Sequence, residues 1–301
     1  MTDLMTVSPS PHIRSGRRTT HIMLDVCIAL LPSLAVACFM FGMRALLVTA
    51  VCVVACIVSE LVFELVTKRP VTIGDLSAVV TGLLIGFNLP VDIPLWQAVV
   101  GCIVAIVIVK QLFGGIGCNF ANPAITARIV MTIAFSDTMT AFTHNVDAVS
   151  GATPLASGTA DYVDLFLGRC GGVLGETCKA ALILGGLYLI FRRVITWHIP
   201  VAYIGTVFVF SWLVGEDPVY QILSGGLMLG AVFMATDYST SPNNPWGKII
   251  FGIGCGLITA VIRLFGSYHE GVSFAILLMN ILCPYIDGWT AKRPLGGVKE
   301  K

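Results

Sequence analysis

The sequence contains few charged residues. Asp, Glu, Lys and Arg together make up 12% of its 301 residues, about half the usual share in a soluble domain. The formal net charge is only +1, so the overall charge indicates no particular partner. Hydrophobic residues reach 56% and the mean hydropathy is +0.89. This composition excludes a soluble enzyme, a nucleic-acid-binding protein and a disordered protein.

Motifs for metals and nucleotides are also missing. The ten cysteines are too scattered to form a disulfide framework, and no set of four residues has the spacing of a metal site. A buried thiol is usually just a small apolar side chain. The sequence has no nucleotide-binding motif. We therefore predict no metal site, and we expect no turnover by this chain alone.

Long apolar runs are abundant. Each is close to the roughly 20 residues that a transmembrane helix needs. The sequence therefore predicts an all-α integral membrane protein with ten transmembrane helices. The runs cover residues 22–42, 45–66, 74–91, 94–113, 121–136, 176–195, 198–215, 220–237, 247–265 and 272–289.

The basic residues are distributed unevenly among the connections. With the N-terminus in the cytoplasm, the inner segments hold 13 of the 18 Lys and Arg residues, including Lys110. The outer segments hold four, and Arg128 lies within a span. Because cytoplasmic loops carry the excess of basic residues, we predict that both termini are cytoplasmic. The four outer basic residues are Arg44, Arg169, Lys179 and Arg263.

The two halves of the chain share short motifs in the same order. Lys110 lies in Ile-Val-Lys-Gln-Leu-Phe-Gly, which resembles Val-Ile-Arg-Leu-Phe-Gly around Arg263. Ser77 corresponds to Ser224, because each follows a Leu and a nearby Pro-Val pair. Five spans is an odd number, so the second five-helix repeat would be inverted relative to the first. The alternative is coincidence in a chain rich in Leu, Gly and Ala.

This organisation divides the chain into five segments. Residues 1–20 form a cytoplasmic arm, and residues 291–301 form a cytoplasmic tail. Residues 21–136 and 176–290 form the two five-helix repeats. Residues 137–175 form the longest connection, which faces the extracytoplasmic side. Loops of this length are often functional.

The long outer loop contains a motif of small and hydroxyl-bearing residues. It begins at Asp147 and continues through Ser150, Gly151, Ala152 and Thr153 to a proline. The small residues leave the backbone open, and the proline favours an extended conformation at Thr153. This pattern suits an enzyme that holds the chain and modifies a hydroxyl group. An ordinary polar turn is the alternative.

The motif resembles the flavinylation sequence of Mg²⁺-dependent FMN transferases that act outside the cytoplasm. Nearly the whole chain resembles the D subunit of the Rnf (Rsx) electron transport complex, a relative of the B subunit of the Na⁺-translocating NADH:quinone oxidoreductase. The segments that carry the resemblance are Ser10–Arg14, Asp25–Pro32, Gly114–Ala124 and Gly271–Asn280.

The resemblance implies that Thr153 carries FMN through a phosphodiester on its side-chain oxygen. Asp147, Ser150, Gly151 and Ala152 would serve recognition by the transferase, and Ser150 is the second candidate acceptor. The redox chemistry would remain with the flavin, while the protein positions it. The resemblance also implies the A, B, C, E and G subunits of the Rnf complex as partners, iron–sulfur centres in other subunits, and a location in the bacterial inner membrane.

Members of this family also hold a second, non-covalent flavin, riboflavin, within the membrane domain. Positions where helices break are candidates to line such a site, because Asn offers a paired donor and acceptor for the flavin edge. Asn also caps helices, which is the structural alternative. The candidate residues are Asn88, Asn119, Asn122, Asp237, Asn243 and Asn244.

Two carboxylates lie near the inner end of the second run. Glu60, Glu64 and Lys68 follow one another at helical spacing. A carboxylate within a membrane segment is a candidate cation or proton site. The alternative is a local salt bridge from Glu64 to Lys68, with Glu60 contacting polar neighbours. We also expect Arg128 to pair with either a carboxylate or a cofactor oxygen.

Together these features predict a membrane flavoprotein that belongs to an ion-translocating ferredoxin:NAD⁺ oxidoreductase complex. As a non-autonomous part of a translocase, it would pass electrons between covalent FMN and other flavins or iron–sulfur centres, coupled to Na⁺ or H⁺ movement. The alternative is a passive small-solute channel or transporter, because inverted five-helix repeats also build channels.

Overall fold

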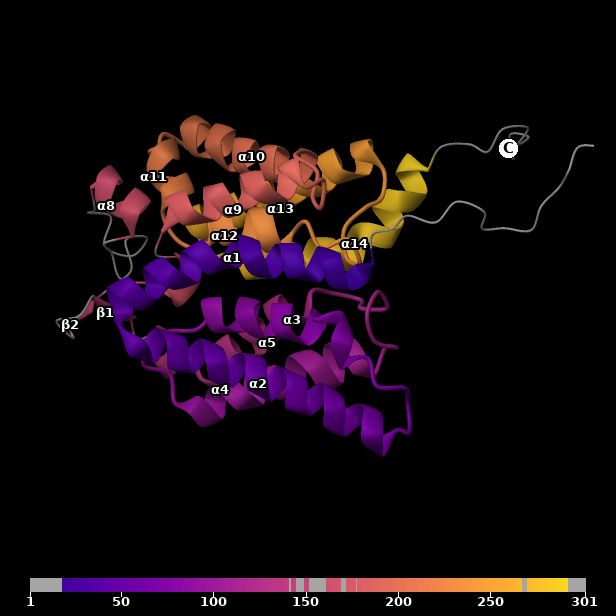
Figure 1. Ribbon diagram of the computed structural model, residues 1–301. Helices are drawn as coiled ribbons and strands as arrows, with labels where there is room; N and C mark the ends of the chain where they lie inside the picture. The colour runs from indigo at the N-terminus through magenta and orange to yellow at the C-terminus, as the bar shows by residue number, and fades with distance from the viewer. Residues whose placement is uncertain are drawn as a thin grey trace, which may run out of the picture.

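A computed structural model describes residues 18–140, 142–144, 149–151, 161–168, 172–176, 178–266 and 270–291. The regular secondary structure of these residues is helical apart from one two-stranded antiparallel hairpin (Figure 1). The elements are α1 Thr19–Phe41, α2 Met43–Val66, η1 Ile73–Asp75, α3 Ser77–Phe87, α4 Leu95–Ile103, the π-helix η2 Val104–Gln111, α5 Pro123–Ala134, α6 Ser136–Thr140, β1 Phe142–His144, β2 Val149–Gly151, α8 Tyr162–Leu167, η3 Leu174–Glu176, α9 Lys179–Phe191, α10 His198–Val214, α11 Pro218–Leu223, α12 Leu227–Leu229, the π-helix η4 Gly230–Met234, α13 Pro245–Phe265 and α14 Val272–Thr290.

Four helices are long and apolar enough to cross a membrane: α1, α2, α13 and α14. Their outer faces carry large apolar side chains, as does the rest of the bundle surface. Phe39 in α1 and Phe191 in α9, for example, are 86% and 87% exposed. A surface of this kind is stable in lipid and not in water, so the protein is a membrane protein.

The other predicted runs contain shorter helices. Five apolar helices have between 10 and 17 residues in the described part of the chain, and residues 220–237 are divided among α11, α12 and η4. Helix α3 has 11 residues and spans about 16 Å, roughly half the hydrocarbon thickness of a bilayer. It ends just before Asn88, where the sequence predicts a break. Each of the ten predicted runs therefore contains a helix, but several of these helices are only partial spans.

Helix α1 lies between the two halves of the molecule (Figure 1). It packs against α2 and α3 on one side and α9 on the other. Asp25 in α1 links it to α9, because its carboxylate pairs with Arg192 at 3.2 Å and accepts a hydrogen bond from Tyr188. We call the end where α1 begins and α14 ends the cavity end. The opposite end, which carries β1 and β2, is the hairpin end (Figure 1).

Glycines allow close helix packing in both halves. A Cβ atom at Gly82 of α3 would lie 2.6 Å from the Val53 Cα atom of α2. A Cβ atom at Gly256 of α13 would lie 2.8 Å from the backbone oxygen of Tyr203 in α10. Membrane helices have no hydrophobic driving force between them, so small residues that let backbones approach supply much of the packing.

Three basic residues that the sequence analysis assigned to loops lie inside the protein. Lys110 and Lys179 are each 2% exposed, and Arg263 is 9% exposed. Their burial corrects their assignment to loops, because each side chain lies among packed helices. Without them, the connections hold 12 inner and two outer basic residues, so the predicted bias becomes stronger.

Candidate functional site

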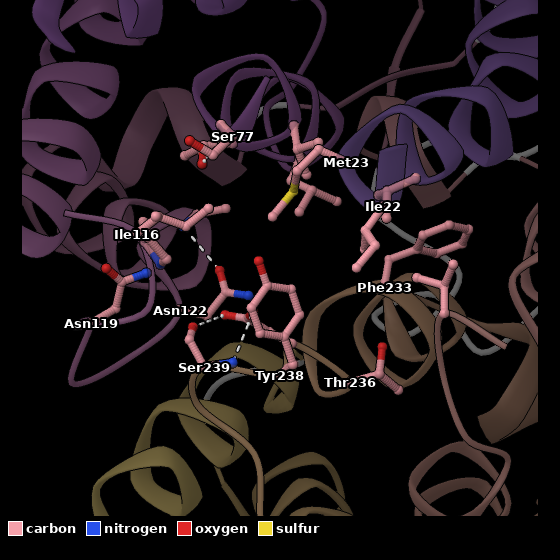
Figure 2. Close-up of a pocket in the computed structure, with 18 of the residues that line it drawn as sticks. Ile22, Met23, Ser77, Ile116, Asn119, Asn122, Phe233, Thr236, Tyr238 and Ser239 are labelled. Atoms are coloured by element: carbon pink, nitrogen blue, oxygen red, sulfur yellow. Dashed lines mark hydrogen bonds between the residues drawn. The ribbon is translucent and has the colours of Figure 1, made fainter. Parts of the chain in front are cut away.

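A cavity lies at the cavity end, between segments from both halves of the chain. The first turns of α1, the start of α3, the end of η2, the segment before α5 and the segment after η4 form its wall (Figure 2). Most of the lining is apolar, with polar groups at a few positions. The polar and aromatic lining residues are Ser77, Thr81, Lys110, Asn119, Asn122, Phe233, Thr236, Asp237, Tyr238 and Ser239.

Three of the six candidate polar residues meet at this cavity. Asn122 is the N-cap of α5, because its side-chain oxygen accepts from the backbone N–H groups of Ala124 and Ile125. Its amide nitrogen donates to the Met234 backbone oxygen at 3.2 Å, which joins the two halves. Asp237 accepts hydrogen bonds from its own turn. The side-chain oxygen of Asn119 is buried and has no protein partner, so it is available to a ligand.

The other three candidates lie elsewhere. Asn88 is buried at the end of α3 and accepts a hydrogen bond from Arg128 at 2.7 Å. The backbone N–H of Asn243 donates to the Asp287 carboxylate, and the Asn244 amide donates to the Thr290 backbone oxygen. Asn243 and Asn244 thus connect the start of α13 to the end of α14. Asn243 also lines a small cavity beside the larger one.

Sequence reasoning missed the buried cation of the cavity wall. The Lys110 ammonium donates to a Glu60 carboxylate oxygen at 2.6 Å and to the Ser77 hydroxyl at 2.5 Å. Gln111 donates to the same Glu60 oxygen at 2.6 Å. Lys110 is the one basic residue within the apolar run 94–113. That isolation was the available signal, because a charge inside a membrane segment normally faces a partner or a cavity.

The two carboxylates of α2 have different partners. Glu60 is fully buried and pairs with Lys110. Glu64 is also buried and accepts hydrogen bonds from the backbone N–H and hydroxyl of Thr72, in the connection before η1. Within the described chain Glu64 therefore pairs with Thr72, and the local ion pair with Lys68 is not formed.

A second charged cluster lies toward the hairpin end. Arg128 of α5 forms ion pairs with Glu176, at 3.3 Å, and with Glu270. Glu270 also accepts from the Gly226 backbone N–H at 2.6 Å. The open choice for Arg128 is thus settled in favour of carboxylates. This cluster joins α5 of the first half to the connections before α9 and α14 of the second half.

The matching motifs of the two halves make matching contacts. Lys110 donates to the side chain of Ser77, and Arg263 donates to the backbone oxygen of Ser224 at 3.3 Å. Lys110 lies at the cavity end. Arg263 lies near the last turn of α13, at the opposite end. Corresponding contacts at opposite ends are what an inverted repeat produces.

The motif that resembles a flavinylation sequence lies mostly outside the described residues, which do not include Asp147, Ala152 and Thr153. Ser150 and Gly151 belong to β2, whose backbone pairs with that of β1. The hairpin lies at the end opposite the cavity (Figure 1).

The chain matches the NQR2, RnfD, RnfE family over residues 6–296. It belongs to this family. It is 49% identical to the D subunit of the Na⁺-translocating ferredoxin:NAD⁺ oxidoreductase complex of Acetobacterium woodii, over 99% of this chain and 97% of that protein. It is 41% identical to the D subunit of the proton-translocating ferredoxin:NAD⁺ oxidoreductase complex of Clostridium ljungdahlii, over 96% and 95% of the two chains. Identity to the D subunit of the ion-translocating oxidoreductase complex of Alcanivorax borkumensis is 36%, over 96% of each chain.

These matches confirm the family resemblance that the sequence carries. The similarity extends over nearly the whole chain, so it covers the cavity, both charged clusters and the connection 137–175. The two relatives with the higher identities are named for different transported ions, Na⁺ and H⁺.

Proposed function

We propose that this chain is the D subunit of an ion-translocating ferredoxin:NAD⁺ oxidoreductase complex. The observation that carries the proposal is the 49% identity over nearly the full length of a protein with that name. The membrane fold agrees with it. The chain would act in the bacterial inner membrane, with the A, B, C, E and G subunits as partners and with both termini in the cytoplasm. The complex would couple electron transfer to Na⁺ or H⁺ movement.

The first redox group in this proposal is FMN, bound covalently to Thr153. The motif from Asp147 to Thr153 supports this assignment, with an FMN transferase as the modifying enzyme. Strand β2, which contains Ser150 and Gly151 of the motif, lies at the end of the molecule opposite the cavity. This end is extracytoplasmic in the predicted orientation. A phosphodiester tether would keep the flavin there while its ring accepts and donates electrons.

The second redox group would be a non-covalent riboflavin in the cavity. The residues present fit a flat, largely neutral ring with polar edges. Phe233 and Tyr238 offer aromatic surface, Asn119 has a free side-chain oxygen, and the start of α5 faces the same space. When bound, the flavin would supply electron transfer. The chain would bind and orient it and exclude water from it.

The inverted repeat gives this arrangement a structural basis. The cavity lies where the two halves meet beside interrupted helices, which is the usual position of binding sites in inverted-repeat membrane proteins. The corresponding contacts of Lys110 and Arg263 support the same division of the chain into residues 21–136 and 176–290.

A fluorescent gel tests the covalent flavin. The chain is co-expressed with an FMN transferase, denatured, and examined for flavin fluorescence. We expect a fluorescent band that disappears in Thr153→Val. Thr143→Val, a matched change in β1 of the same loop, should retain the band. A wild-type band without fluorescence, or fluorescence that persists in Thr153→Val, would contradict the assignment to Thr153.

Flavin extraction tests the cavity. Denaturing the purified complex releases the non-covalent flavin, which is then quantified by chromatography. Asn119→Leu and Thr236→Leu place apolar bulk at the cavity wall and should reduce the released riboflavin at least fivefold. Leu187→Phe, on the outer face of α9, should leave it unchanged. Full riboflavin content in both cavity variants would place the flavin elsewhere.

The alternative function, a passive small-solute channel or transporter, makes opposite predictions. A channel needs neither a modified outer threonine nor redox partners. Uptake of small solutes by vesicles that contain this chain alone, together with the absence of any bound flavin, would favour the channel.

A further inference from the structure

A continuous chain of hydrogen bonds runs from the protein surface to the cavity wall. Asp75, in η1, accepts from the Ser77 hydroxyl at 2.5 Å. The Ser77 hydroxyl in turn accepts from the Lys110 ammonium at 2.5 Å, and Lys110 donates to Glu60 at 2.6 Å. Four helical elements supply one residue each, namely η1, α3, η2 and α2.

Burial of the side chains increases along this series of hydrogen bonds, from Asp75 to Glu60. Asp75 is half-buried, and its neighbour Gly74 is exposed. Ser77 is 5% exposed, Lys110 is 2% exposed and Glu60 is fully buried. Ser77 and Lys110 also line the cavity. These hydrogen bonds therefore connect the protein surface at the cavity end with the interior of the cavity.

The charges around the cavity create a demand for a proton when an electron arrives. Among the described lining residues, Lys110 is the one cation and Asp237 the one carboxylate. The Lys110 charge is already paired with Glu60, and Asp75 adds a further carboxylate beside Ser77. Other nearby charges are Glu64 of α2, paired with Thr72, and Arg69, whose guanidinium donates to the Gln111 backbone oxygen. No unpaired positive charge of the described lining is thus available to balance an added electron.

The groups in this series of hydrogen bonds are suited to carry a proton and not a metal cation. The ammonium group in the middle of the series repels Na⁺. The same ammonium and the serine hydroxyl carry exchangeable protons and can each donate and then be reloaded. The hydrogen bonds already have the length that proton transfer requires.

We propose that Asp75, Ser77 and Lys110 form a proton-uptake relay that delivers protons from the surface to an electron acceptor in the cavity. This inference rests on the proposed flavin site and adds to it a source of protons. The relay serves the redox reaction in the cavity. Glu60 is a positioning residue, because it holds the Lys110 ammonium in the cavity wall.

The transfer balances in protons and electrons. Two electrons reach the cavity from the redox centres of partner subunits, and reduction of a flavin by two electrons consumes one or two protons. For each proton, an N–H bond of Lys110 breaks and the proton joins the acceptor, leaving a neutral amine. The Ser77 hydroxyl, which donates to Asp75 while Asp75 is ionised, then turns toward the Lys110 amine, passes its proton to that amine and takes one from protonated Asp75. Water at the surface reloads Asp75.

Glu60 provides a second feature of the relay. One of its oxygens accepts from both Lys110 and Gln111, while the other is buried without a hydrogen-bond partner. Glu60 thereby fixes the Lys110 ammonium beside Ser77 and the cavity wall.

The test measures proton uptake directly. The purified complex, in weakly buffered solution with a pH-indicator dye, is mixed rapidly with a reduced viologen, an electron donor that releases no proton. Flavin absorbance and dye absorbance are recorded together. We expect Ser77→Ala and Lys110→Met to slow proton uptake and flavin reduction at least tenfold. Ser77→Thr should restore the rate, because it restores the hydroxyl.

Controls separate a relay from a structural role. Thr49→Val removes a different buried hydroxyl, which lies in α2 and donates to the Ala45 backbone oxygen of the same helix. This change should leave the rate unchanged. Asp75→Asn, near the surface, should slow uptake with little risk to folding. The released riboflavin must stay at the wild-type level in Ser77→Ala, which shows that the cavity is intact.

Two results would overturn the relay. The first is wild-type proton uptake in both Ser77→Ala and Asp75→Asn with normal riboflavin content, and it leaves the cavity assignment standing. The second is reduction that takes up Na⁺ and no protons in the wild type. Unchanged riboflavin in Asn119→Leu and Thr236→Leu would instead refute the flavin site itself, so the two failures are distinguishable.

Discussion

The molecule contains a buried charged cluster toward each end, and their surroundings differ. At the cavity end, Lys110 pairs with one carboxylate, that of Glu60, and borders open space. Toward the hairpin end, Arg128 pairs with Glu176 and Glu270 and contacts Asn88. Both clusters connect distant segments of the chain. The first borders the cavity described above, so it lies beside space that a ligand can occupy.

The comparison shows that a buried ion pair is not by itself a functional site. Removing charges from water costs several kcal/mol for each ion, and the pairing must offset this cost. Arg128 is well suited to bridging two carboxylates because its guanidinium has five fixed donors. Lys110 has a compact ammonium that gains and loses protons more readily. The residue types therefore suit a fixed junction at one cluster and proton transfer at the other.

The largest expected effect is at the Arg128 cluster. Arg128→Leu leaves one buried and one half-buried carboxylate, those of Glu176 and Glu270, without this counter-charge. We therefore expect it to lower the free energy of unfolding by about 3–5 kcal/mol. Arg128→Lys should lose less, because it keeps the charge. Unfolding of the purified chain in detergent measures both. Wild-type stability in Arg128→Leu would show that this cluster does not join the two halves.

A smaller effect is expected at the cavity cluster, and it should be reversible by a second change. Lys110→Met leaves Glu60 unpaired in the interior. Adding Glu60→Gln removes that charge, so the double variant should be about 2 kcal/mol more stable than Lys110→Met alone. Detergent unfolding gives the comparison. Equal stability of the two variants would mean that Glu60 and Lys110 do not interact.

The start of α5 gives a third, more modest effect. Asn122→Ala removes the N-cap, which we expect to cost about 1 kcal/mol of stability, together with the hydrogen bond to Met234. Asn122→Asp keeps the cap and should recover most of the loss. Because Asn122 also lines the cavity, Asn122→Ala should release less riboflavin on denaturation. Normal stability with reduced riboflavin would separate the binding role from the capping role.

Much of the fold was predictable, because apolar runs of about 20 residues report membrane helices directly. The breaks at Asn88 and before Pro123 were also predictable from Asn, Pro and Gly. The interior partners were not. The position of Lys110 within an apolar run indicates a partner or a cavity, but nothing in the sequence shows that η2 directs it toward Glu60, 50 residues earlier. The packing of the short, interrupted helices decides which of the six polar candidates line the cavity, and three of them do.

The smallest expected effect concerns a surface contact at the hairpin end, between α8 and α11. The Tyr162 hydroxyl donates to Asp217, the N-cap of α11, and this hydrogen bond lowers the pKa of Asp217 below its ordinary 3.8. A lowered pKa in the folded protein means that ionised Asp217 stabilises the contact above about pH 4 and that the stabilisation is lost as the pH falls below it. Tyr162→Phe removes this hydrogen bond, so the pKa of Asp217 should rise toward its ordinary value, and the contact should be weaker above about pH 4 and less dependent on pH. Hydrogen exchange of the α8 and α11 peptides across this range measures the difference, with Tyr285→Phe at the far end of α14 as a control. The riboflavin content should stay constant throughout, because both residues lie far from the cavity end; a parallel loss of riboflavin would show that the two ends are coupled.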